Sequence, residues 1–206
     1  MSAEISGLHL AHDANKCKAW QFKLKMEAPA IHALWQPYLI GSRIRLRPLA
    51  EEDFDALFLA ASDPLIWEQH PDRERYTPRR FQIYFTSGME SRGALAIIDL
   101  ITGKLIGCSR FTDHDPEASF VKIGFTFLKR EYWGDSTNRE LKALMLDYAF
   151  QFVNTVYFIV GAENLRSRKA MTKLGAVETE RAHATRIHPA LDASVVYEIE
   201  KMNWEA

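Results

Sequence analysis

The chain has 206 residues, of which 47% are hydrophobic and 26% are charged, and its formal net charge is −1. This composition is typical of one ordinary globular domain, and the balanced charge creates no field that would attract nucleic acid or an anionic membrane. No apolar run approaches the length of a membrane span, and the first residues lack a signal-peptide pattern. Cys17 and Cys108 have neither metal-site nor disulfide spacing, so we expect a cytoplasmic protein without a metal.

Residues 1–38 are the hardest part of the chain to interpret. Lysines alternate with Trp20, Phe22 and Leu24 in the middle of this segment, which would suit a short amphipathic strand or helix. We treat the segment as an accessory element, an oligomer contact or an arm attached to a domain that spans residues 39–206. Either this arm or the last strands could mediate a homodimer.

Apolar periodicity and turn chemistry predict the elements of the first half. Leu39–Leu49 alternates apolar and basic residues as a strand does. Glu51–Ala61 has one apolar face and ends before Pro64, because the residue before a proline disfavours helix. A second helix begins at Thr77-Pro78 and runs to about Arg92. The other strands predicted here are Ala94–Asp99, Leu105–Phe111 and Ser119–Leu128, with turns at Thr102-Gly103 and Thr112–Pro116.

The most informative stretch runs from Phe125 to Phe152, where a strand, a polar turn and a long helix follow one another. The helix carries apolar residues on more than one face, which predicts burial on more than one side. A turn of small polar residues leaves backbone N–H groups at the helix start without intrahelical partners, and these can bind an anion such as phosphate. An ordinary helix capped by Asp135, Ser136 or Thr137 explains the same residues equally well.

A strand, a short helix and a hairpin are predicted after the long helix. Val156–Val160 is the strand, and the helix Arg166–Leu174 ends at Gly175, where glycine fits the left-handed position. The last two strands are Val177–His183 and Val195–Met202, joined by a loop through His188-Pro189. Strands and helices alternate only in the middle of the chain, which favours an α/β fold with a mixed sheet flanked by helices.

The short helix has an unusual start. Arg166, Arg168 and Lys169 lie in its first turn, where the positive end of the helix dipole disfavours cations. A nearby phosphate would relieve this conflict, because the arginine fork matches phosphate oxygens. A solvated basic surface is the alternative interpretation.

The ordered set of motifs W-G-x-x-x-N, N-x-R-S and L-G-A, placed between these elements, resembles the GNAT superfamily of acyl-CoA N-acyltransferases. It is most similar to the branch of the ribosomal-protein N-terminal acetyltransferases (RimJ/RimL-like). The resemblance implies a mostly antiparallel twisted sheet, splayed between the fourth and fifth strands. It also implies acetyl-CoA as co-substrate and transfer of its acetyl group to an amine.

By this resemblance, the turn binds the pyrophosphate, the strand end pairs with the pantetheine arm, and the basic helix start holds the 3′-phosphate. Asn164 caps that helix and contacts the pantetheine. The residues expected to bind acetyl-CoA are Phe127, Leu128, Trp133, Gly134, Asp135, Ser136, Thr137, Asn138, Asn164, Arg166, Ser167, Arg168 and Lys169.

Three residues depart from the family pattern. Glu131 and Ser136 replace usual residues of the phosphate turn, and Lys122 stands where many members carry a glutamate base. His114, in the turn before the fourth strand, is the candidate general base, since its ordinary pKa suits proton transfer. Its alternative role is that of an exposed turn residue.

The predicted reaction is direct attack of an amine on the acetyl-CoA thioester. The acceptor could be a protein N-terminus, a lysine, a polyamine or another small amine, and Trp67, Glu68, His70 and Tyr76 near the expected acceptor pocket suggest a cationic one. The departures from the family pattern motivate an alternative, a catalytically degenerate acyl-CoA-binding or regulatory module.

Overall fold

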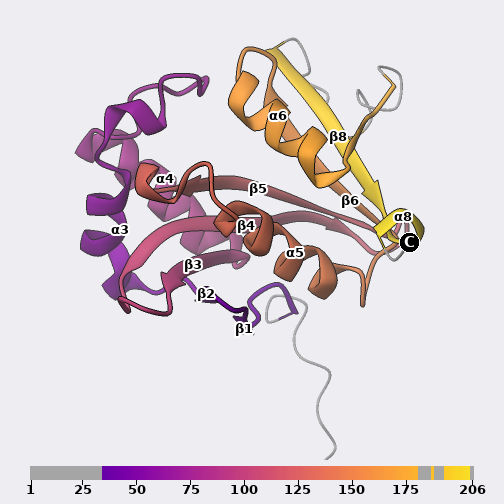
Figure 1. Cartoon of the computed structure of the whole chain (residues 1–206), viewed down its shortest axis with the longest axis horizontal. Helices are drawn as coiled ribbons and strands as arrows, with labels where there is room; N and C mark the ends of the chain where they lie inside the picture. The colour runs from indigo at the N-terminus through magenta and orange to yellow at the C-terminus, as the bar shows by residue number, and fades with distance from the viewer. Residues whose placement is uncertain (1–33, 181–186, 188–192, 205–206) are drawn as a thin grey trace, which may run out of the picture.

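The computed structural model describes residues 34–180, 187 and 193–204, whose strands form one eight-stranded sheet (Figure 1). The spatial order is β1-β2-β3-β4-β5-β6-β8-β7, and only β5 and β6 pair in parallel. The strands are β1 Leu39–Ile40, β2 Ile44–Pro48, β3 Ala94–Asp99, β4 Leu105–Asp115, β5 Phe120–Leu128, β6 Thr155–Gly161, β7 Val177–Glu178 and β8 Ser194–Glu200. The helices are α3 Phe54–Ala61, α4 Pro78–Ser91, α5 Thr137–Ala149, α6 Leu165–Leu174 and α8 Lys201–Trp204. The predicted mixed, mostly antiparallel α/β fold is confirmed.

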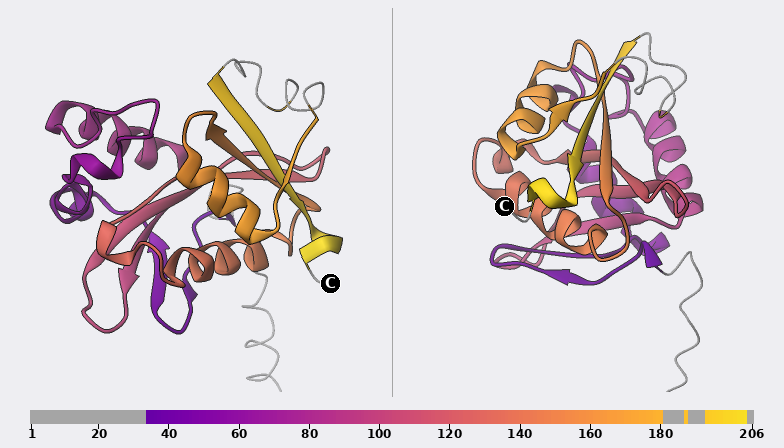
Figure 2. Two further views of the ribbon diagram at one scale, coloured as in Figure 1. Left: turned by 45° about the horizontal axis from the view of Figure 1, so that its top comes forward. Right: turned by 90° about the vertical axis from the view of Figure 1, so that its right-hand side faces the viewer.

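Helices cover both faces of the sheet (Figures 1 and 2). Side chains alternate along each strand, so one strand contributes to two hydrophobic clusters. The cluster on the α5 face includes Leu95, Ile97, Leu141, Met145 and, from α6, Met171. The cluster on the α3–α4 face includes Leu57, Phe81, Ala94, Ala96 and Phe127. Consequently β5 packs against helices on both faces, and one of its edges faces β6.

The single strand predicted over Leu39–Leu49 is wrong, because the chain reverses at Gly41–Arg43 and forms two short antiparallel strands. The carboxylate of Glu140 on α5 accepts hydrogen bonds from the backbone N–H groups of Ser42 and Arg43. This partner is almost a hundred residues away in the chain, so the local alternation gave no sign of the turn.

The turn predicted over Thr112–Pro116 is also misplaced, since β4 continues to Asp115 and includes His114. Thr112 pairs with Lys122 across the sheet, and the reversal follows Asp115, whose carboxylate accepts the N–H groups of Glu117 and Ala118. An Asx-type bond of this kind favours a turn one to three residues after the aspartate.

Several predicted ends shift. The long helix stops at Ala149 instead of Phe152, and β8 stops at Glu200, after which residues 201–204 are helical. The strand predicted over Val177–His183 is extended only at Val177–Glu178; residues 181–183 and the loop through His188-Pro189 lie outside the described residues. Gly175 has φ 88° at the end of α6, as predicted.

The end of the N-terminal segment belongs to the core. Trp35 is only 6% exposed, and its ring lies 5.0 Å from that of Phe111 and 4.9 Å from that of His114. The hydroxyl of Tyr148 donates a hydrogen bond to the carbonyl of Leu34. The domain therefore extends at least to residue 34, and the predicted arm, apart from residues 34–38, lies outside the described residues.

Candidate functional site

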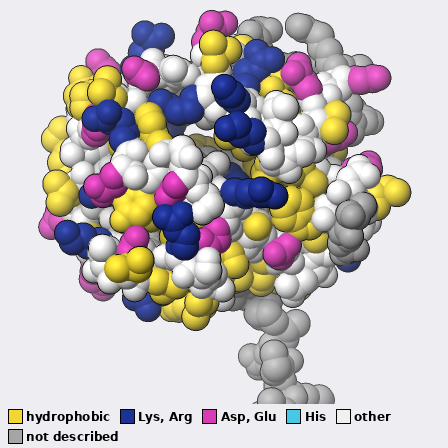
Figure 3. Space-filling model, viewed as in Figure 1, with side chains coloured by type: hydrophobic (Ala, Val, Ile, Leu, Met, Phe, Trp, Pro, Cys, Tyr) yellow, Lys and Arg dark blue, Asp and Glu magenta, His cyan; other side chains and the backbone are white. Residues whose placement is uncertain are grey.

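The candidate site is a cavity of about 750 Å³ between β5 and β6. These parallel strands pair only from Phe120 to Lys122 with residues 155–157 and then separate. A bulge strengthens the divergence, because Phe125 has φ 53° and the β4–β5 register shifts beside it. The separated residues 123–128 and 158–161 form two walls of the cavity. Figure 3 shows its mouth as a hollow bordered by Lys and Arg side chains.

One end of the cavity is the turn before α5. Gly134 has φ 81°, a conformation that residues with a Cβ rarely adopt, and a Cβ built there would meet no other atom. Ser136 is the N-cap of α5, and the carboxylate of Asp135 before it accepts the N–H of Thr137 at 2.8 Å. Among the hydrogen bonds found within the described residues, none is donated by the backbone N–H of Ser136, Asn138 or Arg139. Three amides at a helix start are therefore available to an anion.

The acidic residues of this turn have partners of their own. The guanidinium of Arg43 donates to the Asp135 carboxylate at 2.8 Å and to the Ser136 hydroxyl at 2.7 Å. Partial burial acts to raise the pKa of Asp135, but the hydrogen bonds from Thr137 and the charge of Arg43 outweigh it, and the pKa is lowered. Glu131 pairs with Lys129 at 2.8 Å and does not line the cavity. These contacts remove most of the electrostatic conflict that the sequence suggested.

The outer edge of β5 gives the cavity a second set of backbone groups. Beyond Lys122 no strand among the described residues pairs with this edge, and two carbonyls of β5 accept side-chain donors. The hydroxyl of Tyr84 donates to Phe125 at 2.7 Å, and the indole N–H of Trp133 donates to Leu128 at 3.0 Å. The Phe127 side chain is buried in the α3–α4 cluster, and its backbone pairs with Cys108 of β4.

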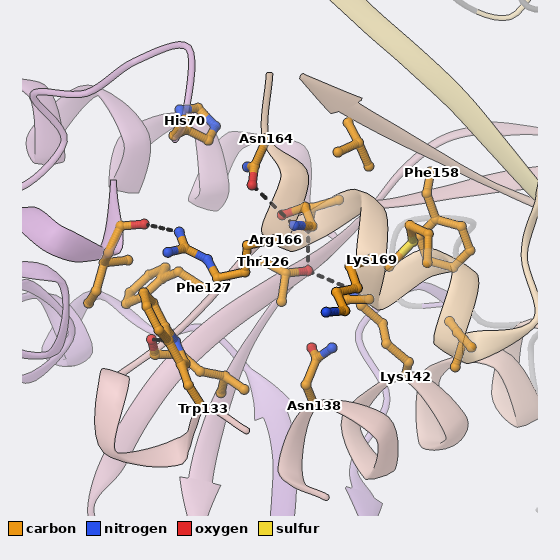
Figure 4. Close-up of a pocket in the computed structure, with 18 of the residues that line it drawn as sticks. His70, Thr126, Phe127, Trp133, Asn138, Lys142, Phe158, Asn164, Arg166 and Lys169 are labelled. Carbon is orange, nitrogen blue, oxygen red and sulfur yellow. Dashed lines mark hydrogen bonds between the residues drawn. The ribbon is translucent and has the colours of Figure 1, made fainter. Parts of the chain in front are cut away.

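The start of α6 lies opposite the turn (Figure 4). The Asn164 side chain accepts the N–H of Ser167 at 3.1 Å, which makes it the N-cap. The guanidinium of Arg166 lies 4.0 Å from the centre of the Trp133 ring and donates to the carbonyl of Ile66 at 2.7 Å. Burial lowers the pKa of Arg166. Arg166 thus joins the turn, α6 and the segment after α3.

The predicted binding residues divide into two groups by position. Those that line the cavity are Phe127, Leu128, Trp133, Gly134, Asp135, Ser136, Asn138, Asn164, Arg166, Ser167 and Lys169. Thr137 is buried in the helix start, and Arg168 points to the other side of α6, where it donates to the Tyr197 hydroxyl at 3.1 Å and lies 3.5 Å from Glu178.

The inner end of the cavity is formed by the segment between α3 and α4. Trp67, His70 and Arg75 line it, and the Arg75 guanidinium lies 5.6 Å from the centre of the Trp67 ring. Burial and then the charge of Arg75 lower the pKa of His70 to about 4, so its ring is neutral at pH 7. Its Nδ1 accepts the N–H of Asp72 at 2.9 Å, which leaves the proton on Nε2. Arg75 carried no signal in the sequence.

His114, the candidate base, and Lys122, which stands where many relatives carry a glutamate, both lie away from the cavity. His114 packs on Trp35, on the α5 side of the sheet, and does not line the cavity. Burial lowers its pKa. Lys122 donates to the carbonyl of Ile187 at 2.8 Å and lies 3.4 Å from Asp113. Within the described part of the chain, neither residue contacts the cavity.

Sequence reasoning missed Lys142, which lines the cavity and is only 3% exposed. Its ammonium donates to the hydroxyl of Thr126 at 2.7 Å. A signal was present, because Lys142 precedes Met145, Leu146 and Ala149 by three, four and seven residues and so lies on the buried face of α5. The presence of a lysine on this buried helix face requires an explanation.

The described residues contain neither a metal-binding cluster nor a membrane-spanning helix. No group of three or more His, Cys, Asp or Glu side chains among them is arranged to hold a metal ion. None of the helices they form is long and apolar enough to cross a membrane.

Comparisons with known proteins agree with this geometry. Residues 43–177 match the family model described as an acetyltransferase (GNAT) domain, whereas no curated protein matches the chain. A GCN5-related N-acetyltransferase from Brucella melitensis superposes with a TM-score of 0.67 at 20% identity, covering 83% of this chain and 81% of the other. A GNAT-family acetyltransferase from Bacillus anthracis gives 0.64 at 17% identity, covering 81% and 99%. The Vibrio cholerae spermidine N-acetyltransferase, solved with CoA and spermine, gives 0.62 at 15% identity, covering 81% and 100%.

Proposed function

The chain belongs to the GNAT acetyltransferase family, and we propose from this that it moves an acetyl group from acetyl-CoA to a primary amine by direct attack of the nitrogen on the thioester. The observation that carries the proposal is the cavity between β5 and β6, which has free amides at one end and an unpaired strand edge along one wall. This combination suits a long ligand with a phosphate at one end and amide groups along its length.

The residues present fit acetyl-CoA. The amides of Ser136, Asn138 and Arg139 would hold its pyrophosphate at the positive end of α5. Lys169 and Arg166 would face its 3′-phosphate from α6. The free edge of β5 near Phe127 would hydrogen-bond the pantetheine amides and, through a backbone N–H, the thioester carbonyl as it gains negative charge. Holding the amine and the thioester together would supply much of the rate.

The acceptor is a primary amine that enters from the segment between α3 and α4. We retain three acceptor classes: a protein N-terminus, which the motif resemblance favours, a lysine side chain, and a small amine. The only residues among Trp67, Glu68, His70 and Tyr76 that line the cavity are Trp67 and His70. Glu68 instead lies 3.5 Å from Arg166, which weakens the argument for a cationic acceptor. We place the reaction in the cytoplasm, where Cys108, buried and free, would stay reduced.

A second candidate is an acyl-CoA-binding module without catalysis. It is favoured by one observation: Asp135 is the only carboxylate among the described residues that line the cavity, and it is paired with Arg43. Such a module would bind acetyl-CoA as tightly as an enzyme does but would release no coenzyme A in the presence of any amine.

The experiment combines calorimetric titration of acetyl-CoA with a thiol assay for released coenzyme A over a panel of amines. The panel contains a peptide with a free N-terminus, a peptide with an internal lysine, spermidine and single amino acids. Binding with turnover supports the enzyme, binding without turnover on the whole panel supports the module, and no binding refutes both.

A pair of glycine variants tests the location of the site. Gly134→Val and Gly103→Val place a β-branched side chain at φ 81° and φ 68°, and at neither position would the added Cβ meet another atom. The two variants should therefore be strained alike, yet only Gly134 borders the cavity. We expect Gly134→Val alone to lose acetyl-CoA binding, and equal losses would contradict the site.

A further inference from the structure

Lys142 is the one ammonium group held deep within the described walls of the cavity. It lies on α5 one turn after Asn138, which also lines the cavity, and its side chain crosses toward β5 (Figure 4). Its hydrogen-bond acceptor, Thr126, follows the bulge at Phe125 and precedes Phe127. The Nζ atom is therefore hydrogen-bonded to the residue that precedes Phe127, near which the thioester is proposed to lie.

The surroundings of Lys142 disfavour its charged form. Its neighbours are the Thr126 hydroxyl on β5, itself 2.7 Å from the Ser109 hydroxyl on β4, and the Phe158 ring on β6, whose centre is 5.5 Å from Nζ. In the described part of the chain, no carboxylate lies within ion-pair distance. An ammonium has three donors, and only one has an acceptor among these residues. Burial is the sole cause of the shift that lowers the pKa of Lys142 to about 7.

The other charged groups that line the cavity do not compensate for this burial. They are Arg139 on α5, Arg166, Lys169 and Lys173 on α6, Arg75 between α3 and α4, and Asp135 in the turn. All except Asp135 are cations, and Asp135 is occupied by Arg43 and Thr137. Hence the cavity offers Lys142 no counter-charge from any side.

The other titratable groups of the cavity are unsuited to taking a proton at neutral pH. His70 accepts the Asp72 N–H on Nδ1 and holds its proton on Nε2, and its pKa is about 4. Burial and the hydrogen bond with Asp99 raise the pKa of Tyr132, which therefore stays protonated. The carboxylate of Asp135 is occupied by the Thr137 N–H and by Arg43 at the other end of the cavity.

We propose that Lys142 carries the proton between the acceptor amine and the departing sulfur. This inference rests on the proposed acetyl transfer and names the group that such a transfer otherwise lacks here. The nitrogen–carbon bond to the acetyl group forms and the carbon–sulfur bond breaks. The nitrogen loses its proton to neutral Lys142, directly or through one water, and the resulting ammonium gives that proton to the sulfur. Lys142 returns to its neutral form, so the cycle consumes no other acid or base.

The test uses the whole chain and begins with a measurement that needs no turnover. Lysine labelled with ¹³C at the ε-carbon is incorporated, and its resonances are followed from pH 5 to pH 11, with Lys142→Met identifying the signal of Lys142. The proposal expects this signal to titrate near pH 7, apart from the other lysines. Titration near 10, like an exposed lysine, would overturn the proposal whatever the activity.

The second measurement is kcat/KM for the best amine of the panel as a function of pH. If the reaction needs a neutral group, the slope of log(kcat/KM) against pH is larger by one below the pKa of that group. The wild-type plot should therefore bend at about pH 7. Lys142→Met should lose about 10²- to 10⁴-fold in kcat, a typical contribution of general acid–base catalysis, and should also lose the bend. Its affinity for acetyl-CoA should stay close to that of the wild type. Lys104→Met, which changes an exposed hairpin residue, is the matched control.

The outcomes separate the two proposals. Absence of turnover by the wild type on every amine counts against the proposed function, whereas a Lys142→Met variant with wild-type kcat and an unchanged bend counts against Lys142 alone. Acetyl groups found on Lys142 by mass spectrometry during turnover would make it an acceptor and overturn the proton-transfer role. If Lys142→Met does not fold, Thr126→Val is tested in its place. This change removes the acceptor that stabilises the ammonium form of Lys142, so the bend should move to lower pH, and an unmoved bend contradicts the proposal.

Discussion

Replacing Lys142 with methionine should stabilise the protein, even though it is expected to abolish most of the activity. The pKa of this ammonium is 10.5 in an unstructured chain and about 7 in the fold, because burial removes water from the charge. Each pKa unit corresponds to about 1.36 kcal/mol. Keeping Lys142 in the fold therefore costs roughly 4 kcal/mol at pH 7. Methionine has a similar length, carries no charge and can fill the same space.

The sign of the pH dependence follows from proton binding. Between pH 10.5 and about 7 the unfolded chain has bound a proton at Lys142 that the folded chain has not. Lowering the pH through this window therefore stabilises the unfolded state and reduces the free energy of unfolding. Below pH 7 both states are protonated, and the penalty is constant. The advantage of Lys142→Met should be full at pH 7 and below, and should vanish as the pH approaches 10.5.

Urea unfolding of the wild type, Lys142→Met and the exposed control Lys104→Met at pH 7 and at pH 10 measures this difference directly. After the fold relaxes around the amine, we expect Lys142→Met to gain about 2–4 kcal/mol at pH 7, which corresponds to roughly 5 °C or more in Tm for a domain of this size. The control should change by less than about 0.5 kcal/mol. A Lys142→Met variant that is less stable than the wild type at pH 7, or equally stabilised at both pH values, would refute the reasoning.

Three further predictions concern binding and stability. Lys169→Met should weaken the binding of acetyl-CoA about tenfold, measured by calorimetry, without weakening the binding of 3′-dephospho-CoA. Arg168→Met, on the side of α6 away from the cavity, should leave both affinities unchanged. An equal effect of the two changes would exclude Lys169 from the phosphate site. Arg75→Met should raise KM for amines that also carry a carboxylate and lower it for spermidine, since it removes a cation from the inner end of the cavity; unchanged amine preference would contradict this. Glu140→Ala should lose about 1–3 kcal/mol in urea unfolding, because two N–H groups of the β1–β2 turn lose their acceptor, and wild-type stability would show that water replaces it.

The features that could be predicted from the sequence are those determined by neighbouring residues. Asn164 caps α6 and Gly175 ends it in a left-handed conformation, as predicted, because both depend on a single helix end. The mixed, mostly antiparallel sheet follows from the motif resemblance together with the alternation of elements. In contrast, the β1–β2 turn depends on Glu140, and the helical end of the chain is joined to α5 by a hydrogen bond from the Trp204 indole to Asp147 at 2.7 Å. Such distant partners leave no local pattern.

The site shows the same division. A polar turn before a helix is visible in the sequence, so most of the residues expected at the phosphate end do line the cavity. Which of two neighbouring cations on α6 faces the cavity depends on how the helix is rotated against β8. Arg168 is turned to Tyr197 of that strand, while Lys169 is turned to the cavity. His114 is a candidate base because of its ordinary pKa and its place in a predicted turn, but β4 is longer than predicted and places His114 on Trp35 instead.

The position of Lys142 connects the fold to the chemistry. If β5 and β6 stayed paired beyond Lys122, the middle of α5 would pack against a continuous sheet, and a lysine there would face only apolar side chains. Because the strands separate, the same face of α5 meets the cavity at Asn138 and Lys142 and the core at Leu146 and Ala149. The separation that opens the cavity thus also places a buried amine on its wall. A lysine that costs the fold stability has its explanation at this point of the cavity, since active sites commonly hold groups that the fold alone would reject.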